Sequence, residues 1–131
     1  MSVKLNTIAL EHARTLIQAG MFVADERELW SEHHPSTAME NEFIRANGFP
    51  QYSSWFLAIN SRYEQQTRRY WEFPHGDFDR VHRCALLAAE SGARERRYFE
   101  IELAARELVA LIDSRDPTEP RSSRSVDPDA D

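Results

Sequence analysis

The sequence predicts an all-α fold: a single compact bundle of four or five helices, with an irregular connector near residues 60–76 and a disordered C-terminal tail. Three observations favour it. Apolar residues recur at spacings of three and four, capping residues and glycines flank those segments, and 41% of the 131 residues are hydrophobic. A chain of this length buries one core rather than two. We therefore expect one helical domain over 1–113 and a tail over 114–131.

The N-terminal half supplies two of the expected helices. The first spans residues 7–19, where Ile8, Ala9, Leu16 and Ile17 form an apolar stripe and Gly20 is placed to end the helix. Residues 24–31 show little pattern before His33-His34-Pro35 breaks the chain. A capping box over 37–40 then predicts a helix that stops at residues 47–48.

The C-terminal half contains the expected core. Residues 55–59 are apolar on every side and predict a short buried helix that begins near residue 53 or 54 and stops at Asn60. Two longer helices follow, over 78–91 and 93–113, and Gly92 is expected to join them as an antiparallel pair. The last helix carries an apolar stripe formed by Tyr98, Ile101, Ala105, Leu108 and Ile112.

The tail has a different composition. From Ser114 onward the chain is rich in Ser, Arg, Asp and Pro and contains one valine. Such a segment cannot bury enough apolar surface to offset the entropy lost on ordering it. This composition predicts the disordered tail.

Residues 73–84 gather most of the reactive side chains. Pro74 and Gly76 predict a turn, and Asp77 is placed to accept hydrogen bonds from the first turn of the helix expected at 78–91. Asp77 is therefore assigned as a structural cap. Asp79 lies in that same first turn, where its charge complements the helix dipole. Cys84 falls at the core margin, about 200° around a helix from His82, so a thiol and base pair is disfavoured.

A ligand or partner site is expected where the connector meets this turn. Free N–H groups, arginines, an imidazole and an indole could converge there on a small anion or a partner side chain. The candidate residues are Arg68, Arg69, Trp71, His75, Asp79 and His82.

Metal binding is an alternative interpretation of the same residues. His75, Asp79 and His82 could share one ion, and Glu32, His33 and His34 form a second group of candidate ligands. Zinc sites in small domains usually show paired Cys or His ligands at short spacings, and this chain has a single cysteine. We therefore predict no metal, no cofactor and no catalytic residue.

Nucleic-acid binding is a third alternative, because arginines and aromatic residues interleave between residues 62 and 98. From residue 60 to 97, however, eight arginines are offset by six acidic residues, and the whole chain carries a net charge of −6. Nucleic acid is therefore an unfavoured partner. The arginines are Arg62, Arg68, Arg69, Arg80, Arg83, Arg94, Arg96 and Arg97.

Three motifs stand out within residues 49–113. They are Trp-Phe-Leu-x-Ile at 55–59, Phe-Pro-x-Gly-Asp-Phe-x-x-Val-His-Arg at 73–83 and Ile-x-x-Ala-Ala at 101–105. In these motifs the chain resembles small uncharacterised bacterial and prophage-type helical proteins. The resemblance implies that the turn and the following helix form one structural unit, and it implies no activity, cofactor or catalytic residue.

Taken together, these features favour a small non-enzymatic interaction or accessory protein whose partner is another protein. No nucleophile elbow, phosphate-binding loop or zinc-protease motif is present. The N-terminus lacks the apolar run of a signal peptide, and no segment is long enough to span a membrane. Because one cysteine cannot form an intrachain disulfide, we expect a cytoplasmic location.

Overall fold

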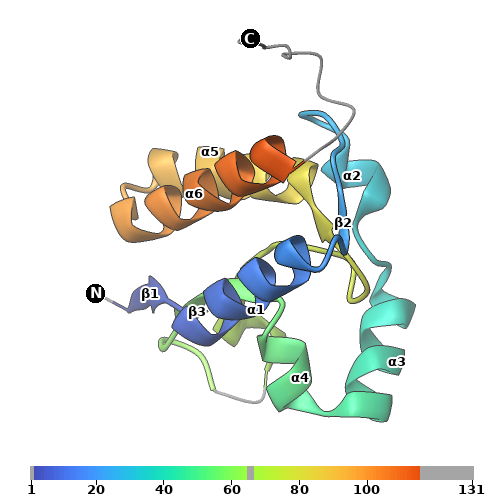
Figure 1. The fold of residues 1–131 in the computed structure, drawn as a ribbon. Coiled ribbons are helices and arrows are strands. Elements are labelled where there is room, and N and C mark those ends of the chain that lie inside the picture. The colour runs from blue at the N-terminus through green and yellow to red at the C-terminus, as the bar shows by residue number, and fades with distance from the viewer. Residues whose placement is uncertain (1, 65–66, 116–131) are drawn as a thin grey trace, which may run out of the picture.

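The computed structural model describes residues 2–64 and 67–115 and shows a mixed α/β fold (Figure 1). The prediction of an all-α bundle is therefore wrong. The elements in chain order are β1 (Val3–Leu5), α1 (Thr7–Gln18), β2 (Phe22–Val23), α2 (Trp30–His33), α3 (Thr37–Asn47), α4 (Phe49–Ser53), β3 (Phe56–Asn60), the 3₁₀ turn η1 (Arg68–Tyr70), β4 (Trp71–Pro74), β5 (Val81–His82), α5 (Arg83–Glu95) and α6 (Phe99–Arg115). No helix among the described residues is long and apolar enough to cross a membrane.

A three-stranded antiparallel sheet replaces the buried helix expected over residues 55–59. β3 is its central strand and pairs with β1 on one side and β4 on the other. An apolar run of five residues fits a buried strand as well as a buried helix, and periodicity alone cannot separate the two. Here neighbouring strands satisfy both backbone edges of the run, since Ala58 lies opposite Leu5 and Glu72.

α1 confirms the first predicted helix and is tied to the sheet at its start. The Oδ1 atom of Asn6 accepts a hydrogen bond from the Ala9 N–H and caps the helix. The amide nitrogen of the same side chain donates to the carbonyls of Ser53 and Phe56, which fixes α1 against β3. Gly20 follows the helix with φ +80°, as expected of a residue that ends it.

α5 and α6 form the predicted antiparallel pair, but their boundaries differ from the prediction. α5 begins at Arg83 rather than residue 78, and it continues through Gly92 to Glu95. The chain reverses over residues 96–98, where Arg97 has φ 64°. A Cβ at position 92 would lie 3.1 Å from the ring of Phe73, so Gly92 permits close packing inside the helix instead of ending it. α6 extends through Arg115, and residues 116–131 of the expected tail lie outside the described residues.

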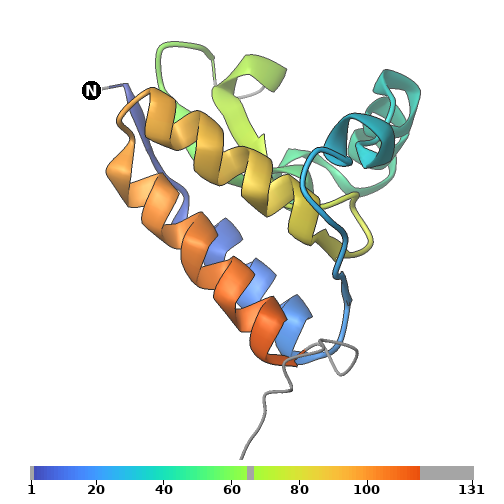
Figure 2. The same cartoon turned by 90° about the horizontal axis from the view of Figure 1, so that it is seen from above.

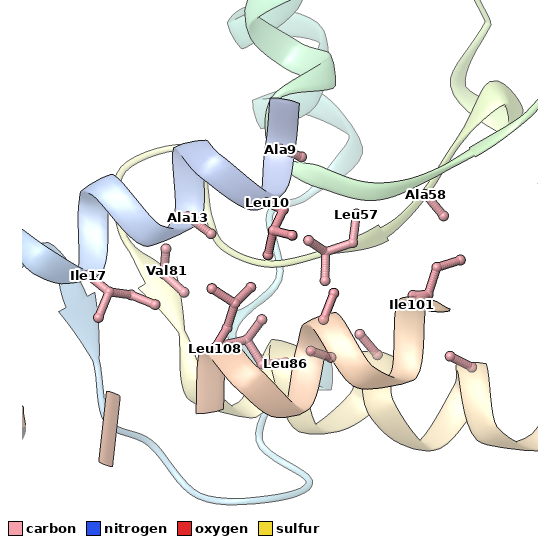
Figure 3. Packing of buried hydrophobic residues seen from close by; sticks show 14 of the residues in the cluster. Ala9, Leu10, Ala13, Ile17, Leu57, Ala58, Val81, Leu86, Ile101 and Leu108 are labelled. Carbon is pink, nitrogen blue, oxygen red and sulfur yellow. The ribbon is translucent and has the colours of Figure 1, made fainter. Parts of the chain in front are cut away.

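The main core lies between α1 and β3 on one side and the pair of α5 and α6, which lie side by side in Figure 2, on the other. The part of the molecule formed by these three helices and their shared interior is called the helical layer below. Figure 3 shows Ile17 of α1, Leu57 of β3 and Leu108 of α6 pointing into this shared interior. All three side chains are completely buried. Apolar burial contributes roughly 25 cal/mol for each Å² removed from water, so these contacts dominate the stability of the fold.

A second core cluster is aromatic and lies beside α3 and α4. It consists of Tyr52, Trp55, Phe56 and Trp71. Phe78 packs onto its margin and stacks on Phe43 of α3, with ring centroids 4.6 Å apart. The predicted helix over α3 is present, although Ser36 rather than Thr37 supplies its capping oxygen.

Residues 76–82 form a turn and a short strand instead of the first part of a helix. β5 pairs in parallel with β2, which places Phe22 opposite Val81 and Val23 opposite His82. The strand is only two residues long and therefore carries no periodic pattern. This parallel pair brings together the segments that form the site described next.

Candidate metal centre

Two segments far apart in sequence meet at the start of α5. The register of β2 and β5 places Asp25, two residues after Val23, beside Cys84, two residues after His82. The backbone N–H of Cys84 donates to Oδ1 of Asp25 over 2.7 Å. Asp25 therefore caps α5 from another part of the chain. We call residues 24–36 and 75–84 together the junction.

Three side chains of the junction converge on the other carboxylate oxygen of Asp25. Its Oδ2 atom lies 2.7 Å from Nδ1 of His82, 2.8 Å from Nδ1 of His33 and 3.2 Å from Sγ of Cys84. The Cys84 Sγ lies 3.7 Å from Nδ1 of His33. All four ligand atoms, one from each residue, lie within 4.8 Å of one another.

The cluster is enclosed on most sides. The Asp25 and His82 side chains are 6% and 8% exposed, and Cys84 is completely buried. His33 is 33% exposed and forms the open side. The ring of Trp30, in α2, lies 5.7 Å from the ring of His82. A small ion could reach this cluster past His33.

His82 lies between two carboxylates. Its Nδ1 atom faces Asp25, and its Nε2 atom donates to Oδ2 of Asp77 over 2.8 Å. Burial acts to lower the pKa of His82, but the hydrogen bonds and charges of Asp25 and Asp77 outweigh burial, and the pKa is raised. The ring can therefore donate from both nitrogens as an imidazolium.

The carboxylates of the junction are held ionised by their donors. Burial acts to raise the pKa of Asp25, yet the bonds from His82, Cys84 and His33 outweigh it and the pKa is lowered. The pKa of Asp77 is lowered in the same way against burial, by the N–H of Arg80, by His82 and by the N–H of Asp79. Ionised carboxylates are competent ligands and hydrogen-bond acceptors.

The thiol behaves in the opposite way. Burial, and then the adjacent Asp25 carboxylate, raise the pKa of Cys84 to about 12. Cys84 is therefore protonated at neutral pH and is not an activated nucleophile. A bound cation would reverse this balance, because a metal-coordinated thiol loses its proton.

The ligand types suit a borderline-soft divalent ion. Zinc takes thiolate, imidazole and carboxylate ligands, usually four of them in a tetrahedron. At zinc bond lengths of roughly 2.0 to 2.3 Å, tetrahedral ligand atoms lie about 3.3 to 3.8 Å apart. Four of the six distances between these residues' ligand atoms are 2.7 to 3.7 Å, near that spacing. The whole set lies within 4.8 Å.

The residues proposed from sequence as one metal site are separated in the structure. His82 is in the cluster, whereas His75 is completely buried elsewhere, where its Nε2 contacts the carbonyl of Ser54 at 2.9 Å. Asp79 is 74% exposed on its side chain and pairs with Arg80. Of the second proposed group, His33 joins the cluster, while His34 contacts the carbonyl of Pro35 and the ring of Trp30.

The remaining residues of the predicted ligand site also lie apart. Arg68 begins η1, and its side chain is not described. Arg69 is exposed and lies over the ring of Tyr63, 5.6 Å from its centroid. Trp71 is buried in β4 as part of the aromatic cluster. Arg69 and Trp71 do not converge with His75, Asp79 and His82 on one surface.

Several arginines of the proposed nucleic-acid strip pair with acids. Arg83 contacts Asp113, Arg94 contacts Glu90 and Glu102, and Arg96 contacts Glu72. These contacts neutralise much of the local positive charge. They leave a mixed surface rather than a continuous basic track.

Asp77 occupies the turn in which it was predicted to cap a helix. Its Oδ1 atom accepts from the backbone N–H groups of Asp79 and Arg80, so it caps the turn that precedes β5. The helix itself begins later, at Arg83.

Sequence reasoning missed Asp25 and the role of Cys84. The sequence places Cys84 at the core margin of an expected helix, and Asp25 lies in a segment with almost no periodic pattern. The only available signal was that the sole cysteine lies two residues from His82, and that two adjacent histidines occur at residues 33–34.

Comparisons with known proteins add no assignment. No protein-family model, curated protein or solved structure matches the chain. The resemblance of its motifs to bacterial and prophage-type proteins stays a prediction.

Proposed function

We propose that this protein binds a single divalent transition-metal ion, zinc by preference, through Asp25, His33, His82 and Cys84. The observation that carries the proposal is the convergence of four ligand atoms of three chemical types within 4.8 Å. Two ligands come from residues 24–36, one from the end of β5 and one from the first turn of α5, so the ion joins distant parts of the chain. An ion held in this way ties the long connection between β2 and α3 to the helical layer.

The hydrogen-bonding pattern around Asp25 supports this proposal. Three donor groups surround one Asp25 oxygen, and each can present a lone pair to a metal once it loses its proton. A zinc ion near this point replaces hydrogen bonds to Asp25 with bonds to the metal.

The test is a zinc titration of the purified chain by calorimetry, with cobalt as a spectroscopic probe. We expect saturation at one ion per chain and a sulfur-to-cobalt charge-transfer band that the Cys84→Ser variant lacks. His33→Ala should weaken zinc binding at least about 10-fold, since it removes one of four ligands.

His34→Ala is the matched control, because His34 is adjacent in sequence and lies outside the cluster. It should bind zinc like the unchanged chain. Failure of the unchanged chain to bind zinc, or equal binding by the His33 and His34 variants, would refute the proposal.

A second candidate function is binding to another protein, and a specific surface favours it. Met39 is 54% exposed on α3 beside a cavity of about 420 Å³ lined mainly by apolar side chains, including Phe43 and Phe78. A substitution of Met39 by Glu should abolish association without lowering stability. Pull-down against a lysate, with Glu42→Gln as a control, would test it.

We also propose a cytoplasmic location, which the single cysteine supports, because a chain without an intrachain disulfide is typical of a reducing compartment. Fractionation of cells that carry a tagged chain would test this location.

A further inference from the structure

The turn over residues 74–80 contacts the cluster through Asp77, a residue that has no role in the proposed metal site. Asp77 is not among the four ligands, yet its Oδ2 atom lies 2.8 Å from Nε2 of His82. The opposite ring nitrogen, Nδ1, is the one that faces the cluster. Whatever controls the proton on Nε2 therefore controls whether Nδ1 has a free lone pair.

The turn holds Asp77 in place by several independent contacts. Oδ1 accepts from the N–H groups of Asp79 and Arg80, and the Asp77 N–H donates to the Arg80 carbonyl over 3.1 Å. A Cβ on Gly76 would lie 2.3 Å from that same carbonyl and 2.5 Å from the ring of Trp55. Only glycine fits there, so the path of the chain into Asp77 is fixed.

Phe78 fixes the other side of Asp77. It adopts φ 73°, a left-handed conformation that is unfavourable for a residue with a side chain. Its ring stacks on Phe43 at 4.6 Å and also lies 5.6 Å from the ring of Tyr52. The aromatic cluster thus holds a strained turn that aims one carboxylate oxygen at His82.

We infer that Asp77 is a positioning residue of the metal centre: it keeps the proton of His82 on Nε2, so that Nδ1 coordinates the ion. A carboxylate that accepts from the outer nitrogen of a ligating histidine fixes the ring and raises its basicity. This inference depends on the proposed function, because it assigns Asp77 a role only in the metal-bound protein.

The Asp77→Asn variant separates this role from the capping of the turn. Asparagine retains an oxygen for the N–H groups of Asp79 and Arg80, so its NH₂ group replaces the oxygen that faces His82. An NH₂ group is a donor and favours a bare Nε2, which moves the ring proton to Nδ1 and blocks coordination. Asp79→Asn is the matched control. It removes the same charge from an exposed side chain that lies two residues further along the chain.

The experiment measures zinc affinity and cobalt spectra of the unchanged chain and both variants, after circular dichroism has verified their folding. We expect Asp77→Asn to weaken zinc binding by about 10- to 100-fold and to shift the cobalt d–d bands, and Asp79→Asn to change neither. Long-range ¹H–¹⁵N correlations of the zinc-bound unchanged chain should show the His82 proton on Nε2.

The outcomes distinguish the two proposals. Zinc binding by the unchanged chain with equal affinity in Asp77→Asn, or with the His82 proton on Nδ1, overturns the role of Asp77 and leaves the metal site standing. Absence of zinc binding by the unchanged chain overturns both. If Asp77→Asn fails to fold, the position of the His82 proton decides the matter without any variant.

Discussion

The helical layer and the junction both bury side chains, but they depend on different interactions. In the layer, residues such as Ile17, Leu86 and Leu108 pack apolar surfaces against one another. In the junction, the buried side chains of Asp25 and His82 depend on hydrogen bonds with defined partners. Apolar packing tolerates many arrangements of similar volume, whereas a buried carboxylate requires each of its donors. The layer therefore provides stability, and the junction provides a position at which chemistry can occur.

The largest expected effect lies in the layer. Leu108 is completely buried in α6, so Leu108→Ala should lower the free energy of unfolding by about 2 to 5 kcal/mol. Leu103 lies on the same helix and is 59% exposed, so Leu103→Ala should change it by less than about 0.5 kcal/mol. Urea denaturation measures both. Similar losses in the two variants would contradict the assignment of the core face of α6.

A buried histidine should make the fold sensitive to acid. Burial lowers the pKa of His75 to about 4, the hydrogen bond to Ser54 opposes this effect, and the charge of His12 adds to it. In the unfolded chain His75 therefore binds a proton near pH 6.5, whereas in the folded chain it binds one only near pH 4. Stability is lost as the pH falls through this window, by about 3 kcal/mol in total.

His75→Gln tests this loss because glutamine still donates to Ser54 but does not titrate. The raised pKa of His82 has the opposite effect on stability, since its folded form holds a proton more tightly. The difference between the unchanged chain and His75→Gln isolates His75. Parallel urea midpoints for both proteins from pH 7 to pH 4.5 would exclude a buried neutral His75.

The difference between the helical layer and the junction also explains which elements could be predicted from sequence. α1 lies close to its expected position because an apolar stripe at spacings of three and four extends over several turns. The same kind of stripe predicted α6, although that helix begins at Phe99 rather than residue 93. The strand β3 was predicted as a helix because its apolar run of five residues has no period. The two-residue strands β2 and β5 were invisible for the same reason, and they are the elements that bring Asp25 to Cys84.

The candidate site was consequently predicted only in fragments. His33 and His82 were both named, but in separate groups, since nothing local relates residues so far apart. Once α5 begins at Arg83 rather than residue 78, His82 belongs to a strand, and its angle to Cys84 no longer follows helical geometry. Tertiary pairing rather than local pattern therefore determines the site.

Zinc should protect the junction against proteolysis. Arg27 is the only lysine or arginine between Arg14 and Arg45, so trypsin can cut the connection between β2 and α3 only there. An ion held by Asp25 and His33 on either side of Arg27 resists local opening. At zinc concentrations 100 times the dissociation constant, cleavage after Arg27 should slow by up to about 100-fold. Cleavage after the exposed Arg45 should not change, and equal protection at both sites would indicate a global effect instead.

The smallest expected effect concerns the ion pair that joins the two regions. Arg83, in the first turn of α5, contacts both carboxylate oxygens of Asp113 near the end of α6, at 2.7 and 3.3 Å. The two side chains are partly exposed, so solvent screens much of their attraction. Asp113→Asn should therefore lower the free energy of unfolding by about 0.2 to 1 kcal/mol, and less in 1 M salt.

A double-mutant cycle of Arg83→Met and Asp113→Asn isolates the coupling, with the more exposed pair of Glu42 and Arg45 as a reference. Because α5 carries Cys84 one residue after Arg83, zinc should not alter this coupling if the layer holds α5 rigidly. A coupling that grows on addition of zinc would mean that the start of α5 moves when the ion binds. The metal site of the junction would then affect the packing of α5 in the helical layer. In that case the two regions would not be independent at this helix.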